Sequence, residues 1–233
     1  MGTIGHGYGS EWHLLRHLGY HRNYFSQEVL KVTGGNTIEW LDFKFSPKIV
    51  ALKNDREFIG LEFIKDMQVQ EKWKSFWAQH GNSQNWDAVG KIHFDNRYEW
   101  LLVEAKAHMS EIHSDCGAEN LTSKQKILLA LKKTSQAFGN ESKPIEAWLE
   151  NYYQHANRLA ALHFLMNECV PSVNARLLFI YFYGENRKNI KCPQNKEEWL
   201  GIDKFCELSK RVHDLFLPVN PLGAEVRSKS NGG

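Results

Sequence analysis

Residues 84–106 read Gln-Asn-Trp-Asp-Ala-Val-Gly-Lys-Ile-His-Phe-Asp-Asn-Arg-Tyr-Glu-Trp-Leu-Leu-Val-Glu-Ala-Lys, and this stretch decides the fold. Asp95 and Asn96 tolerate left-handed backbone and can close a turn through their own side chains, so the stretch predicts a β-hairpin centred on them. In that register Asp87 lies directly opposite Glu104. Directly opposed residues share a face because side chains alternate along a strand, so the two carboxylates are expected on one side of the hairpin.

The polar face of the predicted hairpin gains a third member in Lys106, two residues beyond Glu104. The other face is expected to be apolar and to carry Trp86, Ala88, Gly90, Ile92, Leu101, Val103 and Ala105. Two neighbouring carboxylates can hold a divalent cation, and their hard oxygen atoms suit Mg²⁺ or Mn²⁺. Such a cation polarises a phosphoryl oxygen and lowers the pKa of a bound water, while a lysine can stabilise the charge that develops. The pattern predicts a site built on a buried sheet.

The placing of Asp87 and of Glu104-Ala105-Lys106 resembles the signature of the PD-(D/E)XK superfamily, the restriction-endonuclease-like nucleases. In that family the aspartate begins one strand, and the Glu-x-Lys ends the next after an apolar run such as Trp100-Leu101-Leu102-Val103. The proline that often precedes the aspartate is replaced here by Trp86. The resemblance implies a metal-dependent nuclease that hydrolyses phosphodiester bonds of DNA or RNA. Asp87 and Glu104 would ligate Mg²⁺ or Mn²⁺, and Lys106 would be catalytic.

Two further catalytic residues are implied by their places in the family pattern. Many members carry a glutamate on the first helix that points at the site, and Glu11 is its counterpart in the helix expected from residue 11 to Leu18. The alternative role for Glu11 is a first-turn charge favoured by the helix dipole. A helix after Glu-x-Lys often carries a glutamine or lysine near the metal, and Gln154 resembles that element. The alternative for Gln154 is a surface amide.

Nucleic-acid contacts are expected from two helices. Asn157 and Arg158 lie about one helical turn from Gln154, and we expect them to contact the backbone of the substrate. Lys124 begins a row of lysines on the helix predicted at 123–138, which continues with Lys126, Lys132 and Lys133. Such a row is either a solvated face or a source of phosphate contacts. Glu111 either supports the site by pairing with Lys106 or begins a helix.

A stripe of three histidines marks the first predicted helix. His13, His17 and His21 recur at intervals of four residues, so they fall along one side of the helix if it continues past Gly19. No partner ligands from another element are evident for a tetrahedral zinc site. The spacing therefore favours a solvated or nucleic-acid-facing stripe. Ser10 is expected to cap this helix.

The whole chain predicts one α/β domain over residues 1–227, followed by a disordered tail at 228–233. Besides the hairpin, the expected elements are helices at 11–18, 72–79, 123–138 and 143–167, the last capped by Ser142, strands at 38–45 and 175–183, and one or two helices within 195–217. This order matches the restriction-endonuclease-like α-β-β-β-α-β core. That core is a central mixed sheet flanked by helices, here with extra C-terminal helices.

Composition narrows the choice of partners. The 29 basic and 27 acidic residues give a net charge of only +2. The protein would therefore need a local basic patch to bind its expected nucleic-acid partner, for which DNA is the first expectation. No apolar run reaches membrane-spanning length, and the four cysteines form no Cys-x-x-Cys pair. These features favour a cytoplasmic protein with free thiols and no membrane partner. The alternative to the nuclease is a non-catalytic module of the same fold that binds nucleic acid or protein.

Overall fold

The central hairpin predicted from residues 84–106 forms as expected. The computed structural model describes residues 7–41, 57–79, 84–139, 144–200 and 209–221. Strands β4 (Ala88–Phe94) and β5 (Arg97–Lys106) are antiparallel, with Val89 opposite Leu102 and the turn at Asp95 and Asn96. The turn is held from outside by the Asn36 amide, which donates to the Asp95 carboxylate at 2.7 Å. The predicted register is therefore confirmed.

Three more strands extend the hairpin into a five-stranded mixed sheet. Strand β1 (Thr37–Trp40) pairs antiparallel with β4, whereas β6 (Ala175–Tyr183) and β7 (Val212–Pro218) continue parallel to β5. The order across the sheet is β1-β4-β5-β6-β7. Strand β6 is apolar apart from Arg176 near its start, because its alternate side chains enter two separate cores, one on each face of the sheet. The α/β class and the mixed central sheet are confirmed.

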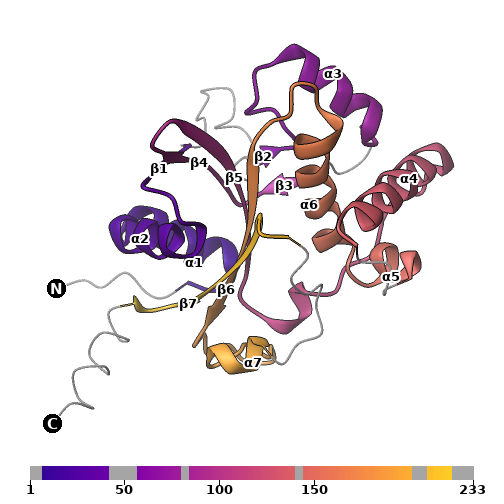
Figure 1. Cartoon of the computed structure of the whole chain (residues 1–233). Coiled ribbons are helices and arrows are strands. Elements are labelled where there is room, and N and C mark those ends of the chain that lie inside the picture. The colour runs from indigo at the N-terminus through magenta and orange to yellow at the C-terminus, as the bar shows by residue number, and fades with distance from the viewer. Residues whose placement is uncertain (1–6, 42–56, 80–83, 140–143, 201–208, 222–233) are drawn as a thin grey trace, which may run out of the picture.

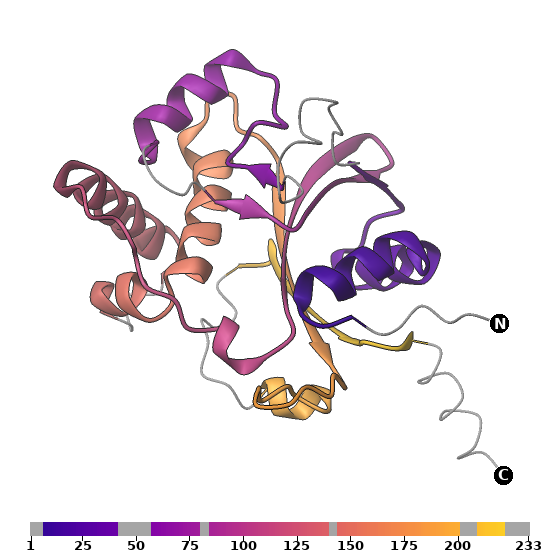
Figure 2. The same cartoon turned by 180° about the vertical axis from the view of Figure 1, so that it is seen from behind.

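Helices cover both faces of the sheet (Figures 1 and 2). Helices α1 (Ser10–Gly19) and α2 (Arg22–Thr33) lie on one face. On the other face, α6 (Tyr153–His163) packs next to the sheet, and α3 (Met67–Phe76), α4 (Leu121–Ala137) and α5 (Ile145–Glu150) surround it. The two apolar faces of the sheet are thus both removed from water, which makes any charged side chain on them costly unless it is paired.

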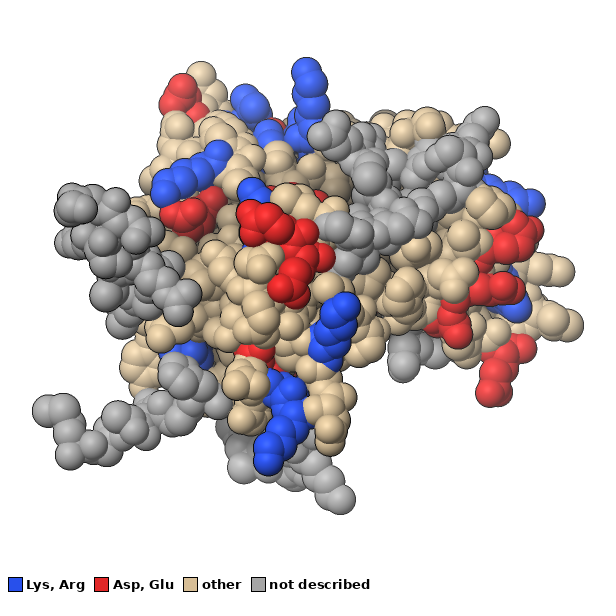
Figure 3. Space-filling view, turned by 90° about the horizontal axis from the view of Figure 1, so that it is seen from below, with Lys and Arg blue, Asp and Glu red and all other residues tan. Residues whose placement is uncertain are grey.

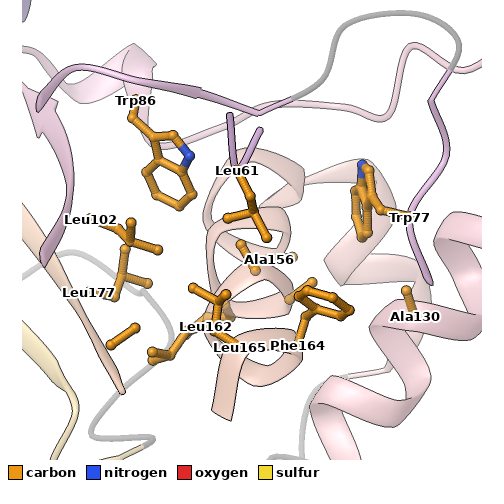
Figure 4. Close-up of a cluster of buried hydrophobic side chains, with 14 of the residues drawn as sticks. Leu61, Trp77, Trp86, Leu102, Ala130, Ala156, Leu162, Phe164, Leu165 and Leu177 are labelled. Atoms are coloured by element: carbon orange, nitrogen blue, oxygen red, sulfur yellow. The ribbon is translucent and has the colours of Figure 1, made fainter. Parts of the chain in front are cut away.

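Trp86 departs from the predicted alternation. It belongs to the short strand β3 (Asn85–Trp86), which pairs with β2 (Phe58–Ile59) in a separate two-stranded sheet. The chain bends at Asp87 between β3 and β4, so Trp86 packs with Leu61 and Leu102 on the side of α6 (Figure 4). Its indole nitrogen donates to the Gly60 carbonyl at 2.7 Å. The expectation that Trp86 shares a face with Ala88 is therefore wrong.

The long helix expected at 143–167 is broken into three pieces. Helix α5 ends at Glu150, α6 begins at Tyr153, and a π-helical turn, η2 (Phe164–Glu168), follows α6. The break allows the loop at Ser114 to meet the start of α6, where the Ser114 hydroxyl accepts a hydrogen bond from the Gln154 backbone at 2.7 Å. A periodic apolar pattern continues through such a break, which is why it was not predicted. The expected cap Ser142 lies outside the described residues.

The C-terminal region differs most from the prediction. In the described part of 195–217 the structure has the short helix α7 (Lys196–Leu200) and, where a second helix was expected, the strand β7. Leu215 and Leu217 enter the core beneath α1 and α2, whereas Phe216 packs against the opposite core, so the segment is covered on both sides. The second half of the strand expected at 38–45 and the tail at 228–233 lie outside the described residues. No helix in the described ranges is both long and apolar enough to cross a membrane.

Candidate functional site

The predicted polar trio gathers at the carboxyl end of β5. Lys106 donates from Nζ to Glu104 Oε1 at 2.6 Å, with both side chains nearly inaccessible to solvent. Asp87 lies directly before β4 and is only partly exposed. Its Oδ2 accepts the backbone N–H of Ala105 at 2.6 Å, which fixes one carboxylate oxygen against β5. Glu104 and Lys106 thus come from one strand, and Asp87 is held against the same strand end.

Helix α6 supplies two more members of the cluster. Gln154 Oε1 accepts a second hydrogen bond from Lys106 Nζ at 2.5 Å, so the helix does cross near the end of β5. Arg158, one turn further along α6, donates to Glu104 Oε2 from Nε at 2.9 Å and from Nη2 at 2.7 Å. Glu104 therefore has a cation on each of its oxygen atoms, which is the arrangement that makes a buried carboxylate tolerable.

The two carboxylates of the cluster have opposite pKa shifts. Burial raises the pKa of Glu104, but Arg158 and Lys106 lower it more strongly, so its pKa lies below the ordinary value. Burial raises the pKa of Asp87, and the neighbouring negative charge of Glu104 raises it further, to about 8. At neutral pH the pair therefore holds one ionised and one largely protonated carboxyl, as two like charges at one site require.

A small pocket opens beside the cluster, at the carboxyl ends of the parallel strands β5 and β6. Its lining residues are Glu104, Lys106, Glu111, Ile112, Tyr152, Gln154, His155, Phe179 and Tyr181. The His155 ring stacks on Phe179 with ring centroids 4.0 Å apart and forms an aromatic wall. The carboxyl ends of adjacent parallel strands, next to a helix N-terminus, are a frequent location for ligand sites in α/β proteins.

Figure 3 shows the end of the molecule where α7 lies, below the sheet of Figure 1. Acidic and basic side chains are interspersed over the part of this surface that is coloured, without a continuous basic area. Mixed charge of this kind provides little long-range attraction for a polyanion. A nucleic-acid substrate would therefore rely on local contacts here.

Glu11 and an additional residue, Glu57, are close enough for their charges to interact. Glu11 is exposed on the first turn of α1. Burial raises the pKa of Glu57, and the charges of Glu11 and Glu104 raise it further, so both lie near enough to act on it. Glu57 was not predicted because it stands outside the Asp…Glu-x-Lys pattern.

Ser10 and Glu111 have structural roles that differ from the first expectations for them. Glu111 Oε2 accepts hydrogen bonds from the backbone N–H groups of Ala107 and His108. Because His108 is the N-cap of the short 3₁₀ helix η1 (Met109–Glu111), Glu111 stabilises the start of that helix, which is the alternative role considered for it. The Ser10 hydroxyl donates to Glu111 Oε1 at 2.9 Å and makes no cap hydrogen bond to α1. The N-cap of α1 is Gly9, so the predicted Ser10 cap is wrong.

The predicted nucleic-acid contacts on α6 are not on the surface. Asn157 and Arg158 are 7% and 4% exposed, and Arg158 Nη1 donates to Asn157 Oδ1 at 2.6 Å. Arg158 also donates to the Asn85 carbonyl at 2.6 Å and lies over the Trp86 ring. The expected outward placement of these two residues is corrected: Arg158 faces Glu104 because α6 is pressed against the sheet.

Lys124 occupies a different position from the other predicted contact residues. It is exposed on α4, which packs against α5 and α6 and lies on the far side of α6 from the sheet (Figure 1). In the same row, Lys133 pairs with Glu168 at 3.0 Å, and Lys126 donates to the Lys74 carbonyl at 2.6 Å. Lys124 therefore remains a possible contact for phosphate, but α6 separates it from the Asp87–Glu104 cluster.

The histidine stripe of α1 turns inward. His13 and His17 are 1% and 0% exposed, and His13 Nε2 meets Glu185 Oε2 at 2.6 Å. Burial lowers the pKa of His17 to about 4, so this imidazole is neutral at physiological pH. The described residues contain no group of three or more histidine, cysteine, aspartate or glutamate side chains arranged to hold a metal. The expectation of a solvated stripe is wrong for His13 and His17, which face the core beneath α1, whereas His21 lies beyond α1 as the half-buried N-cap of α2.

The elevated pKa of Asp87 predicts a distinctive stability profile. The folded value of about 8 exceeds the ordinary value of 3.8, so this group stabilises the native state fully below pH 4, and the contribution is lost as pH rises through 8. Asp87→Asn cannot ionise, so its stability relative to the parent should rise between those limits by on the order of a few kcal/mol. Urea unfolding of both proteins at about pH 5, 7 and 9 checks this difference. Parallel profiles would contradict the assignment.

The oxygen atoms of Asp87 and Glu104 are the candidate ligands for Mg²⁺ or Mn²⁺ at this site. Asp87 and Glu104 provide hard oxygen atoms that repel each other, and within the described residues Asp87 Oδ1 has no hydrogen-bond donor. A divalent cation would relieve that repulsion, so the residues fit such an ion once Asp87 has lost its proton.

Comparison of the chain with family models, with curated proteins and with solved structures gave no match.

Proposed function

We propose that this protein is a metal-dependent hydrolase of phosphodiester bonds in nucleic acid, related to the PD-(D/E)XK nucleases. The observation that carries the proposal is the meeting of Asp87, Glu104, Lys106 and Gln154, from three separate segments, at the carboxyl end of β5. Buried charges cost free energy, and clusters of them with perturbed pKa values are concentrated at functional sites. The small pocket beside the cluster marks the side from which a substrate phosphate would approach it.

The order of the elements agrees with this proposal. Helix α1 precedes the antiparallel strands β1, β4 and β5, after which helices lead to the parallel strand β6. This sequence of elements corresponds to the α-β-β-β-α-β core of the superfamily. Fold alone does not establish an activity, so the assignment depends on the residues of the site.

Each residue has a part in the proposed reaction. Asp87 and Glu104 would hold Mg²⁺ or Mn²⁺, which supplies polarisation of a phosphoryl oxygen and a lower pKa for a bound water. Lys106, held between Glu104 and Gln154, presents an ammonium at the pocket, where it can stabilise negative charge that develops on the phosphate. Gln154 fixes the direction of the lysine and lines the pocket itself. The buried Arg158 keeps Glu104 ionised and oriented.

Calorimetric titration with Mn²⁺ tests the proposal directly. The parent should bind the ion and, with Mg²⁺ or Mn²⁺, cleave labelled single- or double-stranded oligonucleotides, whereas Asp87→Asn should lose both properties. The matched control is Glu71→Gln, which removes an exposed carboxylate paired only with Lys74 on α3. A parent that neither binds Mn²⁺ nor cleaves any of the DNA or RNA substrates would overturn the proposal.

The second candidate is the non-catalytic module of the same fold. It is favoured by one observation, the neutralisation of both Glu104 oxygen atoms by Lys106 and Arg158. A carboxylate paired twice in this way is already stable without a metal. The same titration separates the candidates, because a module that binds nucleic acid would bind the oligonucleotides with no dependence on Mn²⁺ and no cleavage.

A further inference from the structure

The amino ends of β5, β6 and β7 carry three arginines around one glutamate. Glu99 is fully buried, and its Oε2 accepts from Arg176 Nε and from Arg211 Nη1, both at 2.6 Å. Its Oε1 accepts from Arg97 Nε at 3.1 Å. Because the three strands are parallel, their amino ends meet at the edge of the sheet opposite the end that carries Glu104. Glu99 and Glu104, five positions apart on β5, also point to opposite faces.

We call Arg97, Arg176 and Arg211 around Glu99 the arginine cluster. Its positive charges outnumber its negative charge. Three guanidinium groups share one carboxylate in the described part of the chain. The neighbouring His213 lies 3.1 Å from Arg176, and burial together with the two nearby arginines lowers its pKa to about 4, so it stays neutral. The cluster therefore keeps a local excess of about two positive charges at physiological pH.

The cluster is both rigid and open to solvent. The Phe94 ring lies near two of its members, with the guanidinium carbons of Arg97 and Arg176 at 4.6 and 5.2 Å from the ring centroid. Arg97 is 57% exposed and Arg211 is 28% exposed. Each guanidinium has about five N–H donors, whereas a carboxylate offers about four acceptor positions, so many donors remain available at the surface.

We propose that the arginine cluster binds a phosphate group. Planar guanidinium forks match phosphate oxygens in pairs, and the negative charge of a phosphate, one in a diester and up to two in the free ion, offsets the positive excess of the cluster. Glu99 holds the three forks together, so little side-chain entropy remains to be lost on binding. The phosphate can be the free ion or part of a nucleic-acid backbone. The proposal does not rest on the proposed hydrolase, because the cluster lies at the other end of β5.

Isothermal titration with inorganic phosphate, followed by a single-stranded oligonucleotide, tests the proposal on the full chain. The variants are Arg97→Gln and Arg211→Gln, and the matched control is Lys91→Gln, which removes the same charge from the opposite face of the hairpin. We expect saturable phosphate binding with a Kd of about 1 mM or tighter. Each arginine variant should weaken it about tenfold or more, and the lysine control should leave it unchanged.

The outcomes are distinct. If the oligonucleotide binds with a salt dependence that Arg97→Gln reduces, the phosphate belongs to a nucleic acid; if only the free ion binds, the site serves a small phosphate. Absence of saturable binding of either probe by the parent, or equal weakening by all three variants, overturns the proposal. Thermal unfolding checks that each variant is folded, and Arg97→Gln, at an exposed position, is suitable if Arg211→Gln is not.

Discussion

Arg158→Ala should lower the free energy of unfolding by about 3–5 kcal/mol, the scale of removing one partner from a buried ion pair. The guanidinium contacts Glu104, Asn157 and the Asn85 carbonyl from a position that is 4% exposed. Without it, a buried carboxylate keeps Lys106 alone, and two further acceptors lose their donor. Urea unfolding measures the change.

Two comparisons make the Arg158 experiment specific. Arg97→Ala removes an exposed arginine from a glutamate that retains Arg176 and Arg211, so its cost should stay within about 1 kcal/mol. Replacing the pair together, as Arg158→Met with Glu104→Gln, removes the buried carboxylate along with the guanidinium and leaves Lys106 hydrogen-bonded to Gln154 as the remaining buried charge, so it should recover only part of the loss. A single Arg158→Ala variant as stable as the parent would show that Lys106 alone neutralises Glu104.

Lys106→Ala should reduce the turnover of the proposed phosphodiester cleavage about 10²–10³-fold, the effect of removing one preorganised group that stabilises developing charge. The ammonium is held by Glu104 and Gln154 at the pocket, so its direction is fixed before a substrate arrives. Because the lysine is not a proposed ligand of the metal, Mn²⁺ binding should persist. Steady-state kinetics beside calorimetry measures the two effects separately.

The control for Lys106 is Lys91→Ala, which removes an amine from β4 at a position opposite Trp100 and away from the pocket. Its turnover should match that of the parent. Arg158 remains on Glu104 in Lys106→Ala, so we expect that variant to fold. Unchanged turnover in Lys106→Ala would assign the lysine to structure rather than to catalysis.

The sequence predicted the structure best where it depends on the local hydrophobic pattern and on turn-forming residues. The hairpin register followed from Asp95 and Asn96, and the continuous apolar run of β6 indicated a strand buried on both faces. The resemblance to the superfamily, rather than a local pattern, placed Gln154 near the end of β5, on the condition that its helix crosses there. Close agreement came from interactions between residues near in sequence or from strongly periodic segments.

The errors came from tertiary contacts that a single sequence does not reveal. Strand β7 depends on pairing with β6, and without that partner its apolar spacing also fits a helix. Trp86 changes side because β3 pairs with β2 rather than continuing β4. Arg158 was expected on the protein surface because arginine is usually exposed, but its side chain is buried in an ion pair with Glu104.

The mixed pairing of the sheet also sets an order in which the charges of the cluster can meet during folding. The hairpin of β4 and β5 closes locally, on a timescale of about 1–10 μs for such elements, and brings Asp87, Glu104 and Lys106 together. The parallel pairing of β5 with β6 must wait for α4, α5 and α6 to be accommodated between them, and non-local pairing is slow. We therefore expect Glu104 to meet Lys106 while still in water and to lose its hydration when α6 brings Arg158 against it, so that desolvation and the second counter-charge come in the same step.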